Sequence, residues 1–173
     1  SDSPLPYFNL GLIYLKSGDY ESAVVNFIAA RDRNPYDIEK YNNSILSISK
    51  RLAKSGDQQY KIGEYKEALS LYLESVKYSP SFSAALYRIT SVYQKLNEYE
   101  LAAEFAKKTL NYDLGHYKAM KSLGDIYSKL GQDEESMQYY RQSIDVNPKY
   151  YKAYYSLAKL LKERGDIDAA VSS

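Results

Sequence analysis

Apolar and small side chains recur along the chain at steps of three and four residues, and this spacing itself repeats every 34 residues. The first copy, residues 4–37, carries Tyr7, Leu10, Gly11, Tyr14, Ala23, Phe27 and Ala30, followed by Pro35. The fourth copy, 117–150, carries Met120, Leu123, Gly124, Tyr127, Ser136, Tyr140 and Ser143 in the same slots, followed by Pro148. Because such steps are typical of amphipathic helices, each copy predicts two helices joined by a turn.

Three further copies follow the same pattern less completely. The second, 49–82, carries Leu52, Gly56, Gly63, Tyr65, Ala68, Tyr72 and Pro80. The third, 83–116, carries Leu86, Ile89, Tyr93, Tyr99 and Ala102, with Thr90 in the first glycine slot and Leu114 in the proline slot. A partial fifth, 151–173, begins with Tyr154, Leu157, Ala158, Gly165 and Ala170 and then stops. Self-similarity at a fixed period of this length predicts a stack of repeats with one continuous core.

The ends of the predicted helices carry their own signals. Left-handed backbone that closes the first helix of each copy is expected at Gly18, Gly63, Gly131 and Gly165, with Asn97 in that slot of the third copy. Acids that suit the start of the next helix follow at Asp19, Asp133 and Asp166. Small residues (Gly11, Gly124, Ala23, Ala68 and Ala102) stand where two helices must approach closely. Pro35, Pro80 and Pro148 end the second helices, because proline has no amide donor.

Eleven residues, 38–48, interrupt the spacing between the first and second copies. Ile38, Tyr41, Ile45, Ile48 and Leu52 form an apolar stripe, and eleven residues make close to three helical turns. The stripe predicts one long helix over roughly 37–61. The alternative is a break at residues 42–44, which would leave a short extra helix or turn.

These residues together resemble the tetratricopeptide repeat (TPR) family over nearly the whole chain. The resemblance implies an all-α, right-handed superhelix of antiparallel helix pairs, forming one domain over 4–173. It also implies that the first helices of successive repeats line a concave groove. Proteins of this kind serve as protein–protein interaction scaffolds and adaptors, so the expected function is binding of a partner segment.

Composition argues against most kinds of chemistry in this chain. It has no cysteine and one histidine, His116, so we expect no metal site, no cofactor and no cysteine or histidine-paired nucleophile. A phosphate-binding glycine loop is also missing from the sequence, and we expect no enzyme activity. There is no apolar run that could span a membrane, and no leader precedes the first repeat. The compartment is left open, with the cytoplasm as the default.

The charge is nearly balanced overall but unevenly placed. Net charge is +1, which does not favour nucleic acid. The columns that the resemblance assigns to the groove nevertheless hold twelve basic side chains against three acids, Asp57, Asp125 and Glu163. The expected contacts of an acidic partner segment are Lys54, Lys61, Arg88, Lys118, Lys121, Lys152 and Lys159, with the aromatic Tyr60, Tyr87 and Tyr155. The alternative is that these lysines only solvate a helix face.

The clamp by which some TPR proteins bind the acidic tails of heat-shock chaperones is not expected. That clamp needs Lys and Asn in its first repeat. The two slots hold Phe8 and Leu12 in the first copy, Ala53 and Asp57 in the second, and Tyr87 and Ser91 in the third.

The first predicted helix is apolar on two sides. Its core side is expected to hold Tyr7, Leu10 and Tyr14, and its groove side Leu5, Phe8, Leu12 and Leu15. A helix apolar on both sides is normally covered on both sides. The cover could be a hydrophobic partner segment, an upstream repeat, or a second copy in a homo-oligomer.

Two other functional interpretations stay open. The chain could be the targeting or substrate-selecting region of a larger enzyme such as a glycosyltransferase, or a self-assembling structural protein. The sequence stops inside the expected second helix of the fifth repeat, which suggests a piece of a longer protein. Alternatively, the polar helix over 150–164 could itself cap the stack.

Overall fold

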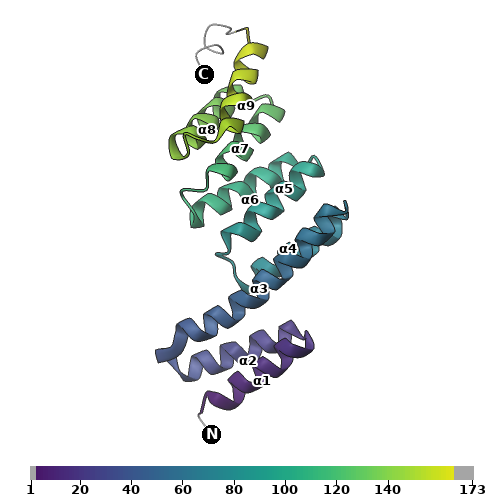
Figure 1. Ribbon diagram of the computed structural model, residues 1–173, viewed down its shortest axis with the longest axis vertical. Helices are drawn as coiled ribbons and strands as arrows, with labels where there is room; N and C mark the ends of the chain where they lie inside the picture. The colour runs from purple at the N-terminus through teal and green to yellow at the C-terminus, as the bar shows by residue number, and fades with distance from the viewer. Residues whose placement is uncertain (1–2, 166–173) are drawn as a thin grey trace. The chain divides into compact units, whose positions relative to one another are not determined.

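The computed structural model describes residues 3–165, and helices are the only regular secondary structure in that range. In chain order they are α1 (Leu5–Ser17), α2 (Tyr20–Arg33), a short 3-10 turn (Pro35–Asp37), α3 (Ile38–Lys61), α4 (Tyr65–Tyr78), α5 (Ser83–Lys95), α6 (Tyr99–Tyr112), α7 (Tyr117–Lys129), α8 (Asp133–Val146) and α9 (Tyr151–Glu163) (Figure 1). The all-α expectation is therefore confirmed. None of the helices over 3–165 is both long and apolar enough to cross a bilayer.

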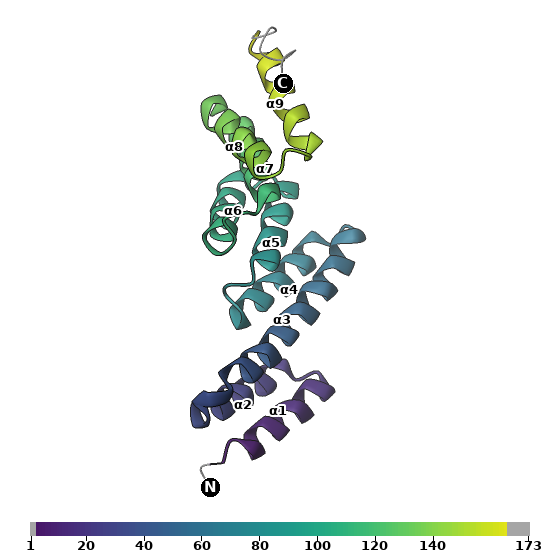
Figure 2. The same cartoon turned by 60° about the vertical axis from the view of Figure 1, so that its left-hand side comes forward.

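The chain divides into two compact units, 1–82 and 83–173. The first holds α1 to α4 and the second α5 to α9, so the division falls at the expected border between the second and third copies. In both units, each helix packs against the next as an antiparallel partner (Figures 1 and 2). The pairs α1–α2, α3–α4, α5–α6 and α7–α8 are the helix pairs that the pattern predicts.

The predicted helix-ending positions are confirmed. Gly18, Gly63, Gly131 and Gly165 have φ between 73° and 88°, and Asn97, with φ 61°, adopts the same backbone in the third copy. Asparagine tolerates this conformation better than other non-glycine residues. At the start of α2, the Asp19 carboxylate accepts a hydrogen bond from the Ser22 amide at 3.0 Å. Asp133 lies in the first turn of α8, and Asp166 lies outside the described residues.

Three glycines allow the two helices of a pair to touch, one in each of the first, second and fourth copies. A Cβ at Gly11 would come within 2.6 Å of the Phe27 ring, and one at Gly56 within 2.5 Å of the Tyr72 ring. A Cβ at Gly124 would likewise overlap the ring of Tyr140. Each glycine therefore leaves the space that an aromatic ring sixteen residues later fills.

The third copy packs the same crossing with the sizes reversed. Thr90 takes the glycine slot of α5, and Ala106 takes the aromatic slot of α6, again sixteen residues later. Both side chains are fully buried. The larger residue thus moves from the second helix to the first, which explains why this copy tolerates the loss of its glycine.

The inserted residues form one unbroken helix with the second copy. α3 runs from Ile38 to Lys61, so the long-helix prediction is confirmed and the alternative break at 42–44 is wrong. Ile45 and Ile48 lie in a cluster with Phe27, which places the insert against α2.

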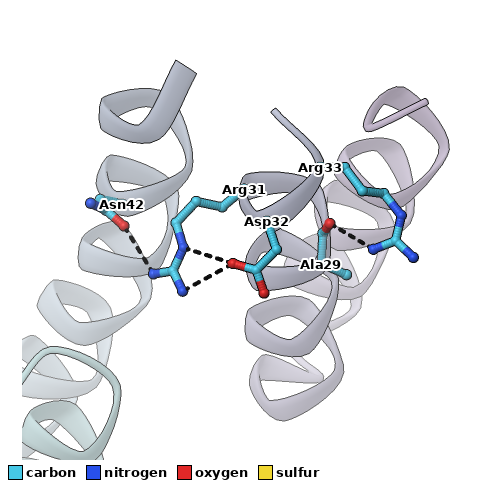
Figure 3. A network of polar contacts seen from close by, with 5 residues as sticks. All are labelled: Ala29, Arg31, Asp32, Arg33 and Asn42. Carbon is cyan, nitrogen blue, oxygen red and sulfur yellow. Dashed lines mark hydrogen bonds and ion pairs between the residues drawn. The ribbon is translucent and has the colours of Figure 1, made fainter. Parts of the chain in front are cut away.

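A polar bridge supports the same junction. The Arg31 guanidinium at the end of α2 donates to Asn42 Oδ1 at 3.4 Å and to Asp32 Oδ1 at 3.4 Å (Figure 3). Arg33 turns the other way and donates to the Ala29 carbonyl oxygen at 2.9 Å (Figure 3). The break predicted by the alternative would have fallen at Asn42, where this bridge meets α3.

The expected sides of α1 need correction. Phe8 and Leu15, expected in the groove, pack against the Phe27 cluster. The Phe8 ring lies 5.6 Å from that of Phe27 and 5.7 Å from that of Tyr41, centroid to centroid. Leu10, expected in the core, is 43% exposed. The repeat pattern named the right positions for a helix covered on both flanks, but only one flank of α1 is covered here.

Candidate functional site

The candidate site in the second unit is the face of α5, α7 and α9 that the resemblance assigns to the groove, called here the inner wall. On α7 it carries Lys118, Lys121, Asp125 and Lys129, whose spacings of three and four residues put them on one side of the helix. On α9 the matching positions are Lys152, Tyr155, Lys159 and Glu163, and on α5 they include Tyr87, Arg88 and Gln94.

A hollow of about 490 Å³ lies on this wall. It is lined by Gln94, Tyr99, Asp125, Ser128, Lys129, Tyr140, Ser156, Lys159, Leu160 and Glu163. Lys129 and Glu163 occupy the last groove column, which could equally have faced solvent, and both line the hollow. The lining carries two lysines and two acids, so the hollow is polar and charge-balanced.

Asp125 is the centre of a fixed polar network. Its Oδ2 accepts from Lys121 Nζ at 2.5 Å, and its Oδ1 accepts from the Tyr140 hydroxyl at 2.9 Å. Burial, and then the neighbouring Asp125 charge, raise the pKa of Tyr140, so this hydroxyl stays protonated and donates. Lys121 is half-buried and its charge is matched, so it contributes less free positive charge than the sequence suggested.

The first unit contains the same tyrosine–aspartate pair without the lysine. The Tyr72 hydroxyl donates to Asp57 Oδ1 at 2.8 Å. Sequence reasoning counted Asp57 and Asp125 only as groove acids and missed this partnership. The signal was present, because an aspartate occurs fifteen residues before each of these tyrosines, whereas Leu12 precedes Phe27 and Ser91 precedes Ala106.

Aromatic side chains gather at the N-terminal end of the inner wall. The Tyr87 and His116 rings lie 4.7 Å apart, and those of Tyr117 and Tyr150 lie 4.8 Å apart, centroid to centroid. Burial, followed by the neighbouring Tyr87 and Tyr117, raises the pKa of Tyr150 to about 12. Tyr155 differs from these packed rings, because 71% of it is exposed.

The remaining predicted cations divide between the units. In the second unit, Lys118, Lys152 and Lys159 are exposed and Arg88 is half-buried. Lys159 Nζ lies 3.7 Å from Glu163 Oε1 at the surface, where such a pair contributes little. In the first unit, Lys54 and Lys61 are exposed on α3.

The first unit also holds the other predicted side chains. The half-buried Tyr60 packs edge-on against Tyr65, with ring centroids 5.2 Å apart. Of the predicted apolar contacts, Leu5 is 58% exposed and Leu12 is 42% exposed. Phe8 and Leu15 belong to the core instead, so replacing Phe8 would test folding rather than binding.

His116 begins α7 rather than merely filling a turn. Its Nδ1 accepts from the Ala119 amide at 3.1 Å, so the imidazole is neutral on this nitrogen and acts as the N-cap. Burial lowers the pKa of the His116 imidazole, against a smaller opposing effect of the Asp113 carboxylate. Protonation would remove the acceptor and place a positive charge at the positive end of the helix dipole.

We therefore expect the stability of the second unit to depend on pH. A histidine whose folded pKa lies below its unfolded value of about 6.5 contributes fully above that pH and loses its contribution as the pH falls through the folded value. His116→Asn, which keeps an acceptor that does not titrate, should remove the loss, of about 1 kcal/mol. Urea midpoints at several pH values between neutral and mildly acid would measure this. A pH profile identical in both proteins would contradict the capping role.

Comparisons with known proteins agree with this geometry. A model described as "Tetratricopeptide repeat" matches residues 6–37, another with that description matches 54–113, and a "TPR repeat" model matches 124–165. No curated protein matches this chain in sequence.

Solved structures show the same fold. MamA 41-end from Desulfovibrio magneticus RS-1 aligns over 99% of this chain and 91% of its own, with 20% identity and a TM-score of 0.66. The first TPR of Spaghetti (RPAP3) bound to HSP90 peptide SRMEEVD aligns over 69% of this chain and 94% of its own, with 20% identity and a TM-score of 0.66. A Thermobaculum terrenum O-GlcNAc transferase mutant aligns over 68% of this chain and 22% of its own, with 20% identity and a TM-score of 0.64.

At this identity the likeness shows the fold alone. The three family models fall on the helix pairs of both units and together cover most of residues 6–165. The glycine–aromatic crossings and the left-handed helix ends recur at the period of those models. The chain belongs to the tetratricopeptide repeat family.

Proposed function

We propose that this chain is a protein-interaction scaffold whose second unit holds an extended acidic segment of a partner on its inner wall. The observation that carries the proposal is the uneven charge of the unit. Eight of its basic residues lie in groove columns, against the two acids Asp125 and Glu163. The other faces of the same unit carry more acids than bases.

The acidic part of the segment would contact the N-terminal half of the wall. Lys118 and Lys152 are exposed there, and within residues 3–165 neither has a carboxylate within ion-pair distance. Arg88 lies on the same columns of α5. Because Asp125 already accepts from Lys121 and Tyr140, its charge is partly compensated and opposes an incoming carboxylate less than an isolated aspartate would.

The hollow would take a different part of the segment. Its lysines and acids balance, and Gln94, Ser128 and Ser156 supply neutral donors and acceptors. Such a lining suits the backbone of an extended peptide, which offers both kinds of group. The exposed ring of Tyr155 adds apolar contact beside Lys152.

One neighbour in structure supports a peptide ligand of this charge. The first TPR of Spaghetti (RPAP3) is described as bound to HSP90 peptide SRMEEVD, a peptide with three acids and one arginine. The paired slots of the chaperone clamp hold other residues in this chain, such as Tyr87 and Ser91. We therefore propose an acidic ligand held by a different set of side chains.

Reversing two charges tests the proposal. Lys118→Glu together with Lys152→Glu should weaken binding of a fluorescent acidic peptide at least tenfold, about 1.4 kcal/mol, and flatten its salt dependence. Fluorescence anisotropy at low and high salt measures both effects.

The matched control reverses two charges away from the wall. Arg141 of α8 and Lys149 of the α8–α9 turn are exposed, and the same change to Glu at both should alter affinity much less. If both pairs weaken binding equally, only net charge matters and the inner-wall site is wrong. Unchanged binding in the Lys118/Lys152 variant would refute the proposal outright.

A further inference from the structure

The side of α1 turned away from the α2 cluster carries large apolar residues that nothing covers in the described chain. Leu10 is 43% exposed and Ile13 is 62% exposed, and Pro6 lies on the same side. This side, called here the open face of α1, is separate from the inner wall, which belongs to the second unit. Lys16 is the one charged residue of α1, so the helix offers little to hold water over this face.

The repeat register shows what normally covers this face. Leu10 and Ile13 correspond to Leu123 and Ile126 of α7, 113 residues later. Both of those side chains are fully buried, in a cluster with Ala102, Ala103 and Ala106 of the preceding helix α6. A helix therefore packs on this face of α7 through small side chains.

The same arrangement occurs at α9. Leu157 and Leu160 are the register equivalents of Leu10 and Ile13, and each is 5% exposed. They cluster with Tyr140 of α8, and Met137 and Ile144 of that helix pack beside them. In both repeats of the second unit, the preceding helix covers this pair of aliphatic residues.

The second copy provides the opposite case. Its register equivalents are Ser55 and Gln58 of α3, and both are exposed. The insert has moved the contact with α2 to Ile45 and Ile48, three turns earlier in the helix. Where this face is left open to water the residues are polar, and where it is covered they are aliphatic. α1 has aliphatic residues on an open face.

We propose that the open face of α1 binds a partner α-helix that presents small side chains, in the manner in which α6 presents Ala102, Ala103 and Ala106 to α7. The size of the residues selects this occupant over a second copy of the chain. A second α1 would set branched residues against branched residues, with no small side chain to let the two backbones approach. An alanine face provides the complement that α6 already supplies within the molecule.

A peptide with the sequence of residues 98–113, which spans α6, serves as the probe. It is added to protein with labelled leucine and isoleucine methyl groups and followed by NMR. We expect saturable shifts at Leu10 and Ile13, and at least a tenfold weaker affinity in Leu10→Ser/Ile13→Ser. A peptide in which the alanines at 102, 103 and 106 are replaced by leucine should bind much more weakly than the probe.

Matched variants separate binding from folding. Both replaced side chains are partly exposed, so the urea midpoint should change little. Val25 of α2 is 60% exposed, and Val25→Ser should leave the affinity unchanged. The acidic-peptide affinity of the second unit should also be unchanged in Leu10→Ser/Ile13→Ser, so failure of this inference and failure of the proposed function are distinguishable.

Three results would overturn the inference. The first is no shift at Leu10 and Ile13 up to about 1 mM peptide, the limit of weak specific binding. The second is binding that survives Leu10→Ser/Ile13→Ser. The third is a dimer, seen by light scattering, that this variant dissolves, which would assign the face to a second copy.

Discussion

Gly124→Ala is expected to destabilise the second unit by about 2 kcal/mol or more, although alanine is the better helix former by about 1 kcal/mol. A Cβ at this position would overlap the Tyr140 ring. The ring cannot move away easily, because it is 3% exposed and its hydroxyl is held by Asp125 at 2.9 Å. Crossing helices must separate or the tyrosine must leave its rotamer, and either change also disturbs the wall that Asp125 and Lys121 form.

Urea unfolding followed by circular dichroism measures the effect, with Gly115→Ala as the matched control. Gly115 is in the same unit, its backbone is not left-handed, and a Cβ there would have its nearest neighbour at 3.7 Å. The control should be neutral or slightly stabilising. Equal midpoints for the two variants would mean that the crossing is looser than the structure indicates.

Most of the fold could be predicted because its determinants are local. Gly18 and Asn97 mark left-handed helix ends by their own backbone preference, and Asp19 caps by its own side chain. The insert could also be assigned, because an apolar stripe through Ile45 and Ile48 is a property of one segment. None of these inferences needs to know what packs against the segment.

The candidate site could be predicted less well because charge depends on neighbours. Lys121 counts as a cation in the sequence, but Asp125 four residues later pairs with it. Asp125 in turn is fixed by Tyr140 from the other helix of the pair, fifteen residues away. The register predicted which residues share a face but not which of them bind one another.

The misassigned residues of α1 have the same cause. Leu10 is aliphatic, as its equivalent Leu123 is, and the pattern placed it in the core. Burial, however, needs a second helix on that side, and a helix supplies only one of the two surfaces. Phe8 was misplaced in the opposite direction, because the inserted turns of α3 bring Tyr41 against it.

The reversed crossing of the third copy allows the strongest test of how the repeats are built. Ala106→Tyr alone should cost about 3 kcal/mol, because Thr90 occupies the space that a glycine leaves in the other copies. Thr90→Gly alone should cost about 2 kcal/mol, from the cavity and the weaker helix. If each aromatic needs only its own glycine, the two changes together should be far less costly than their sum.

The coupling energy separates this idea from simple tolerance. Thr90 and Ala106 stand in the register of Gly124 and Tyr140, so a double-mutant cycle from urea midpoints should give a favourable interaction of about 2 kcal/mol. Adding Ser91→Asp supplies the acceptor that the new hydroxyl would otherwise lack, as Asp125 does for Tyr140. This third change should stabilise the double variant and not the natural chain. Additive costs would mean that the crossing is set by the helices' other contacts, and that the glycine–aromatic pair is a consequence of their distance rather than its cause.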